Sequence, residues 1–332
     1  ERFGSELLDA LPRDIDIWIN EDSVRGAFLE SLRWRGANAF TERTWQIYQA
    51  ILDVDDSQLY VLIELCANVD HPWNAELLHD ILINKMMPER DASWTVKIND
   101  FDMADGSTIR RLLDWCLTSQ TEKTDRHVQL LCGLAVTWLT ASSHREIRDK
   151  ATKALSALLL SKVELYGELC KRFAGLDDLY VIERLHGAAY GACCIDPSLT
   201  RLEHYAPVAY RMVFSEQGVP LSIMLRDYAS GIVELAAHHR CLPTEVDLSA
   251  CRPPYKSQPV QFTVSQAFLD DVATKAGGDE IKRSCTGGIS EFADEIKHRV
   301  SSFSSVALTS QMPHTQSEMN ERFDTEVIAP YS

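Results

Sequence analysis

Two adjacent aspartates, Asp177 and Asp178, are the side chains in this sequence whose types best suit metal chemistry. Acidic residues spaced along one helix face can hold Mg²⁺ around a diphosphate group. In the stretch DDLYVIE the third acid is out of register for that arrangement, and no second Asn/Ser/Glu metal motif is present. An aspartate before the first turn of a helix satisfies free backbone N–H groups. We therefore predict that one of the pair caps the helix that follows.

Histidines near a cysteine are the next candidates for a metal site. His238 and His239 come just before Cys241, and His186 and His204 lie earlier in the chain. Neighbouring residues of a helix point to different faces, so an adjacent pair of histidines is a poor chelate. We predict instead that His238 and His239 end a helix, where the helix dipole favours them.

Cysteine is the third residue type that could do chemistry here. There are nine cysteines, and none are in CxxC spacing: Cys66, Cys116, Cys132, Cys170, Cys193, Cys194, Cys241, Cys251 and Cys285. Several lie inside apolar helical stretches, which is typical of reduced, buried thiols in a cytosolic protein. A catalytic thiol needs a base and an electropositive environment, and Cys193-Cys194 has no histidine at a motif distance.

Motifs for nucleotide or acyl chemistry are absent from the sequence. Neither GxxxxGK[ST] nor GxSxG occurs, and the glycines in GGDE and TGGIS are not followed by Lys-Ser/Thr. We therefore predict no catalytic, cofactor-binding or metal-binding residue in this chain, no cofactor and no enzymatic activity.

Aromatic residues are the remaining candidates, for binding rather than catalysis. All seven tryptophans fall within the first 140 residues: Trp18, Trp34, Trp45, Trp73, Trp94, Trp115 and Trp138. We expect most of them in the core, while exposed members could anchor a partner. The sequence assigns no partner-binding residue. Exposed Trp, Tyr and Arg side chains on a concave surface are where we expect one.

Length and charge limit the classes of partner. The chain has 332 residues, 45% of them hydrophobic, and a net charge of −16 from 49 acidic and 33 basic residues. Such a surface repels nucleic acid and anionic lipid. No apolar run reaches the length of about 18 residues that a membrane helix needs, and there is no signal peptide. We expect a cytoplasmic protein. The start ERFGSELL, without Met, suggests a piece of a longer polypeptide or removal of a tag.

The elements expected to carry these residues are helices. From residue 5 to about 245, apolar residues recur at three and four positions. Three stretches also repeat a pattern in which an arginine is followed three positions later by a small residue. The pairs are Arg148/Ala151, Arg184/Gly187 and Arg226/Ala229. The arginines are 36 and 42 residues apart, near the period of about 40 typical of helix-pair solenoids.

The repeated pattern has a structural interpretation. The small residue lets a neighbouring helix approach closely, and the arginine can bridge carbonyls or carboxylates of the next repeat. The stretch IRDKATKAL (147–155) resembles the second helix of a HEAT repeat. We therefore expect an all-α fold, a HEAT-like α-solenoid of antiparallel helix pairs. A non-repetitive helical bundle is the alternative.

Three segments are expected along the chain: Trp-rich helical repeats over 1–125, HEAT-like helix pairs over 126–245, and a Pro-rich strap with an irregular mixed segment over 246–332. The last begins where four prolines fall within residues 243–262. Proline cannot continue a helix, so the regular array should stop near Pro243. A short helix is expected over 264–276, and a further helix candidate over 289–303.

Several short segments together resemble the region that follows the nucleotide-binding module in large bacterial antiviral STAND NTPases (Avs type). They are SLRWRGANAF (31–40), HPWNAELLHDIL (71–82), MMPERDASWT (86–95), IRDKATKAL (147–155), DDLYVIERLHGAAYG (177–191), LRDYASGIVELA (225–236), PPYKS (253–257) and IKRS (281–284). Relatives tend to carry a DFGRY-like stretch where this chain has EFADE (291–295). The ATPase motifs are absent here, so the resemblance assigns nucleotide hydrolysis to no residue.

The resemblance implies a helical sensor segment that binds a protein partner, expected to be a phage protein. Binding would couple to the remainder of a larger chain that includes an NTPase module, and activation would bring oligomerisation. A general HEAT-type adaptor is the main alternative, and an all-α enzyme acting on diphosphates is a further one.

Overall fold

The computed structural model describes residues 20–52, 58–99, 107–118, 121, 123–215, 218–255 and 266–274. All regular elements in these ranges are helical, and none is a strand, so the all-α expectation is confirmed. The chain divides into two units, residues 1–258 and 259–332. The first unit contains the helices that concern function, and no helix in the described ranges is long and apolar enough to cross a membrane.

The N-terminal helices of the first unit are short. They are α3 (Asp22–Leu32), α4 (Glu42–Leu52), α5 (Gln58–Leu65), α6 (Ala75–Ile83), α7 (Met87–Arg90) and α8 (Val96–Asn99), with a π-helical turn (Asp91–Thr95) joining the last two. Asn74 caps the start of one of them, α6. Its side chain accepts a hydrogen bond from the Glu76 N–H at 2.9 Å, which satisfies a free donor of α6.

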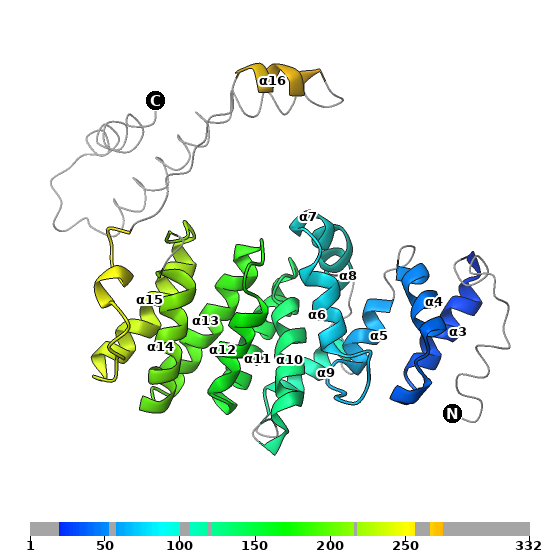
Figure 1. Ribbon diagram of the computed structural model, residues 1–332, viewed down its shortest axis with the longest axis horizontal. Coiled ribbons are helices and arrows are strands. Elements are labelled where there is room, and N and C mark those ends of the chain that lie inside the picture. Colours follow the sequence, from blue (N-terminus) through cyan, green and yellow to red (C-terminus); the bar gives the residue numbers. More distant parts are fainter. Residues whose placement is uncertain are drawn as a thin grey trace. The chain divides into compact units, whose positions relative to one another are not determined.

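Seven further helices, five of them 14 to 17 residues long, continue the unit: α9 (Thr108–Cys116), α10 (Arg126–Leu139), α11 (Arg145–Ser161), α12 (Glu164–Arg172), α13 (Leu179–Ile195), α14 (Leu199–Val213) and α15 (Ile223–His238). Polar caps start four of them. Ser107, Asp125, Asp178 and Ser222 accept from free backbone N–H groups in the first turns of α9, α10, α13 and α15. These helices follow one another along the unit (Figure 1).

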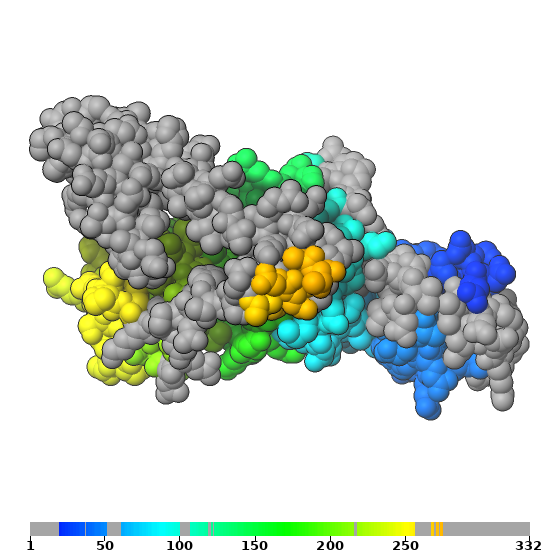
Figure 2. All heavy atoms as spheres, turned by 90° about the horizontal axis from the view of Figure 1, so that it is seen from above, coloured from blue at the N-terminus to red at the C-terminus, as the bar shows by residue number. Residues whose placement is uncertain are grey.

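The helices pack in two layers. In one layer α9 contacts α11, α11 contacts α13, and α13 contacts α15. In the other layer α10 contacts α12, and α12 contacts α14. The pairs α10–α11 and α14–α15 join the layers. From α9 to α13, each helix thus packs on the helix two places further along the chain, and in the space-filling view the colours of unit one follow the chain from blue to yellow (Figure 2).

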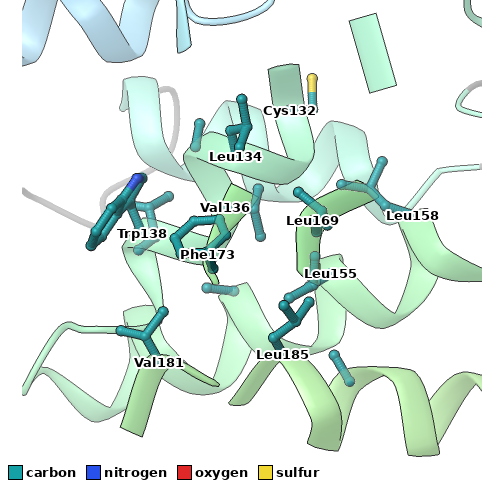
Figure 3. Close-up of a cluster of buried hydrophobic side chains, with 14 of the residues drawn as sticks. Cys132, Leu134, Val136, Trp138, Leu155, Leu158, Leu169, Phe173, Val181 and Leu185 are labelled. Atoms are coloured by element: carbon teal, nitrogen blue, oxygen red, sulfur yellow. The ribbon is translucent and has the colours of Figure 1, made fainter. Parts of the chain in front are cut away.

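The core lies between the two layers. Buried side chains of α10, α11, α12 and α13 meet there, among them Trp138, Leu155, Leu169 and Leu185 (Figure 3). Each is fully or almost fully removed from water, which contributes about 1.5–3 kcal/mol per large apolar side chain. The apolar residues that recur at three and four positions in these helices therefore form this core.

The segment α7–α8 is tied to the longer helices through buried polar contacts. The Trp94 indole N–H donates to the Trp138 carbonyl oxygen at 2.9 Å. Arg90, which is 3% exposed, lies over the Trp138 ring and forms an ion pair with Asp177 at the start of α13. A buried guanidinium needs such partners, because an unpaired buried charge is strongly unfavourable.

Close approach between α13 and α15 depends on two glycines. A Cβ atom at Gly187 would lie 3.0 Å from the Tyr228 ring, and one at Gly231 would lie 2.5 Å from the Tyr190 ring. Each helix therefore inserts a tyrosine where the other has no side chain. This confirms the expectation that the small residue after Arg184 lets a neighbouring helix approach.

The regular array ends at His238, close to the predicted limit. The chain continues through a 3₁₀ turn (Leu248–Cys251), and Arg252 holds it to α15 by an ion pair with Glu234 at 2.5 Å. In the second unit, α16 (Gln266–Ala273) falls within the helix expected over 264–276. The candidate helix over 289–303 and the EFADE stretch lie outside the described residues.

Placing a methyl group at Gly231 tests the close packing of α13 and α15. We expect Gly231→Ala to destabilise the chain, because overpacking costs about 1–3 kcal/mol and outweighs the gain in helix propensity of at most about 1 kcal/mol. Gly26→Ala in α3, where no atom lies within 4 Å, is the control and should stabilise. Chemical denaturation measures both, and equal stabilisation by both changes would contradict the packing.

Buried His186 predicts acid sensitivity. Burial lowers the pKa of this imidazole to about 4, so the folded state binds its proton less well than the unfolded state does. The stability is complete above the unfolded pKa of about 6.5 and falls as the pH drops towards 4, by about 3 kcal/mol in total. We expect His186→Gln to weaken this loss. Denaturation midpoints at pH 5 and 7 measure it, and an unchanged pH dependence would contradict the assignment.

Candidate functional site

The three arginines of the sequence repeat lie in one layer of the structure. Arg148 is on α11, Arg184 on α13 and Arg226 on α15, and these three helices pack successively against each other. All three side chains are half-buried. Helices packed in this way have axes about 8–10 Å apart. The repeat therefore places one arginine on each of three neighbouring helices.

The register between the helices aligns the arginines. Gly187 faces Tyr228, and Tyr190 faces Gly231, so residues 41 positions apart lie opposite each other on α13 and α15. Arg184 and Arg226 are 42 positions apart and so lie at the same level. The guanidinium of Arg148 lies over the ring of Tyr180, one turn before Arg184.

Tyrosine rings accompany each arginine. The Arg184 guanidinium carbon lies 4.9 Å from the Tyr180 ring centroid, and its Nε donates to the Tyr180 hydroxyl oxygen at 2.8 Å. The guanidinium carbon of Arg148, on the neighbouring helix α11, lies 6.0 Å from the centroid of the same Tyr180 ring. The guanidinium carbon of Arg226 lies 4.8 Å from the ring centroid of Tyr255. We call these five residues, Arg148, Tyr180, Arg184, Arg226 and Tyr255, the Arg–Tyr row.

The partners of the arginines differ from those expected. We predicted carbonyls or carboxylates of the next repeat, yet the contact that Arg148 makes with the next helix of its layer is with an aromatic ring. The reason is that α13 presents Tyr180 at this level, and a planar guanidinium stacks well on an aromatic face. A different arginine, Arg201 of α14, donates to a carbonyl oxygen of an earlier helix, that of Leu160 in α11, at 2.8 Å.

The aspartate pair has structural roles. Asp178 caps α13 by accepting hydrogen bonds from the Tyr180 and Val181 N–H groups at 2.9 and 3.3 Å, as predicted. Asp177 accepts from the Met87 N–H at 2.8 Å and pairs with Arg90. The hydrogen bond from Arg90 holds the pKa of the Asp177 carboxyl below the ordinary aspartate value.

The candidate histidines do not come together. His238 is the last residue of α15 and His239 follows it, as expected for a helix end. His186 lies buried with its Nδ1 against the Ile182 carbonyl oxygen, and His204 contacts the Thr200 carbonyl oxygen in the same way. Within the described ranges, no three His, Cys, Asp or Glu residues are grouped to hold a metal ion.

The cysteines are mostly core residues. Cys66, Cys116, Cys132, Cys170, Cys193 and Cys251 are buried free thiols, Cys241 is half-buried, Cys194 is exposed, and Cys285 lies outside the described residues. A hydrogen bond with Cys132 and burial raise the pKa of the Cys116 thiol, and burial raises that of Cys170 to about 12. A thiol with a raised pKa is a poor nucleophile at neutral pH.

The tryptophans divide between core and surface. Trp73, Trp94 and Trp138 are fully buried, which confirms the core interpretation for them. Trp45 is half-buried and stacks on Trp73 with ring centroids 5.4 Å apart. Trp34 is 68% exposed, and Trp18 lies outside the described residues. No tryptophan in the described part of the chain contributes to the Arg–Tyr row.

A groove of about 500 Å³ lies on the other layer, between α10, α12 and α14. Its charged lining is mixed: Glu164 and Glu168 accompany Arg126, Lys171 and Arg211, and Arg126 pairs with Glu168. The groove therefore offers a partner no single sign of charge. The Arg–Tyr row differs from it, because its three charged residues are all arginines.

The tyrosines of the row, Tyr180 and Tyr255, and an arginine of the neighbouring helix α9, Arg110, were not identified from the sequence. Tyr180 lies four residues before Arg184, so the two share a helix face, and this spacing is a signal that could have indicated their contact. Arg110 follows Ile109 as Arg148 follows Ile147, 38 residues earlier, and lies on α9 of the same layer. Arg110 pairs with Asp114 at 3.5 Å.

A double-mutant cycle on the row tests its internal contacts. We expect the coupling between Arg184 and Tyr180 to exceed that between Arg148 and Tyr180, because the first pair is closer and hydrogen-bonded. Exposed cation–π pairs contribute about 0.5–1 kcal/mol. Alanine variants followed by chemical denaturation measure both couplings, with Tyr180→Phe as the control that keeps the ring. Equal couplings would contradict this geometry.

Comparison with protein-family models, with curated proteins and with solved structures gave no match. The resemblance to antiviral STAND NTPases therefore rests on the short segments quoted from the sequence. The candidate site rests on the helix packing and on the contacts of Arg148, Arg184 and Arg226.

Proposed function

We propose that this chain is a HEAT-like α-solenoid that binds a protein partner through the Arg–Tyr row. The observation that carries the proposal is the placement of the three repeat arginines on three successively packed helices of one layer. Stacked helix pairs touch mainly their neighbours, so they present long continuous surfaces on which partners bind. The arginines recur in the sequence after about 40 residues, and of the helices that carry them, α11 packs on α13 and α13 packs on α15, each two places further along the chain. Both observations support a helix-pair solenoid.

The composition of the row suits a binding surface. Arginine and tyrosine are, with tryptophan, the residues that most often dominate the binding energy of protein interfaces. Here Tyr180 restrains Arg184 through a hydrogen bond and a ring contact before any partner arrives. A side chain that is already ordered loses less conformational entropy on binding, which favours affinity.

We further propose that the parent protein is an antiviral STAND NTPase and that this chain is part of its sensor. Support for this step comes from the sequence segments that resemble the family. The partner is then a phage protein, and its binding shifts an equilibrium between inactive and active states of the larger protein. Such a shift requires that the partner bind the active state more tightly than the inactive one.

A phage challenge of bacteria that express the whole protein tests this function. We expect the triple variant Arg148→Ala/Arg184→Ala/Arg226→Ala to lose protection, because it removes three binding anchors while leaving the buried core intact. The matched control is Arg126→Ala/Arg172→Ala/Arg211→Ala, which removes the same charge from exposed positions of α10, α12 and α14. The control should protect like the unchanged protein.

The measured quantity is the plating efficiency of a phage panel, together with the amount of protein in the cells. Full protection by the row variant at normal protein levels would contradict the sensor proposal. Equal loss in both triple variants would also contradict it, since the effect would then not belong to the row.

A further inference from the structure

Within the described residues, one ion pair involves the arginines of the Arg–Tyr row, and it joins Arg148 to Asp149 at 3.7 Å. In the same part of the chain, the Arg226 side chain forms no hydrogen bond or ion pair, and the Arg184 side chain donates only to the Tyr180 hydroxyl. Two acids of the neighbouring turns are engaged elsewhere: Glu183 accepts from Ser222, and Glu234 pairs with Arg252. A positive row in a chain of net charge −16 points to an acidic ligand.

The spacing of the row selects the form of that ligand. Packed helices have axes about 8–10 Å apart, so we expect the guanidinium groups of successive helices to recur at about this interval. A polyproline-II helix has three residues per turn and rises about 3.1 Å per residue, so every third side chain repeats on one face after about 9 Å. A β-strand fits less well, because its residues three apart point to opposite faces.

The tyrosines favour the same form. Rings of Tyr180 and Tyr255 lie half-buried beside the arginines. Proline-rich polyproline-II segments bind to surfaces lined by aromatic rings, and they lose little entropy because they are already extended. An arginine row flanked by tyrosines therefore matches a segment in which acids and prolines alternate with a period of three.

We infer that the Arg–Tyr row binds an acidic polyproline-II segment of a partner protein, with a carboxylate at every third position facing Arg148, Arg184 and Arg226. This inference rests on the proposed function and specifies the chemistry of the partner. Nucleic acid also carries regularly spaced negative charge. The net charge of −16 repels so dense a polyanion, whereas a short peptide carries few charges.

The test is fluorescence anisotropy of the 332-residue chain with labelled twelve-residue peptides. The probe is four repeats of Glu-Pro-Pro. A composition-matched peptide with its four glutamates in one block keeps the charge and loses the spacing. We expect the repeat peptide to bind at least about tenfold more tightly than the block peptide, which corresponds to about 1.4 kcal/mol. Its affinity should fall with added salt.

Variants assign the binding to the row. The triple variant Arg148→Ala/Arg184→Ala/Arg226→Ala should weaken binding of the repeat peptide about tenfold or more, and Arg126→Ala/Arg172→Ala/Arg211→Ala should leave it unchanged. Thermal unfolding of each variant shows that it is folded. Equal binding of the two peptides, equal effects of the two variants, or tighter binding of a single-stranded oligonucleotide of equal charge would overturn the inference.

The outcome is separable from that of the phage challenge. If the row variant loses phage protection but the unchanged chain does not bind the repeat peptide, the inference of an acidic polyproline-II ligand is wrong and the proposed function remains. If the peptide binds at the row while the row variant still protects, the ligand chemistry is correct and the sensor function is wrong.

Discussion

The close approach of α13 to α15 is the constraint on which the candidate site depends. Gly187 and Gly231 leave room for Tyr228 and Tyr190, and no larger residue fits either place without movement of a ring. This contact fixes both the distance between the helices and their register. Because Arg184 and Arg226 lie three and five residues before these glycines, the same contact sets how the two arginines align.

Close helix packing and a charged binding surface thus have a common origin. Each repeated stretch supplies apolar residues for the core and a half-buried arginine, and in α13 the small residue Gly187 also makes room for the neighbouring helix. The core lies between the layers, where Leu155 of α11 and Leu169 of α12 are buried, while Arg148 and Arg184 contact Tyr180 within one layer. Binding and stability therefore involve different side chains, which allows the arginines to be replaced without opening the core.

Much of the fold was predictable from the sequence. Three-and-four apolar spacing indicated the helices, the proline-rich stretch indicated the end of the array, and Asp178 was predicted to cap a helix. The partners of the arginines were not predictable in the same way. Arg148 contacts Tyr180, 32 residues later, and only the packing of α11 on α13 brings this ring rather than a carboxylate to the guanidinium.

By itself, the sequence determined that the chain is helical, that its cysteines are mainly apolar core residues, and that three arginines recur at a period of about 40 residues. These are local properties, set by residue type and spacing along one helix. Only the tertiary structure decided that the arginines share a layer, that tyrosines accompany them, and that among the described residues a single ion pair, with Asp149, involves them. Such features depend on the offset between neighbouring helices, and that offset is fixed by side-chain shape across the interface.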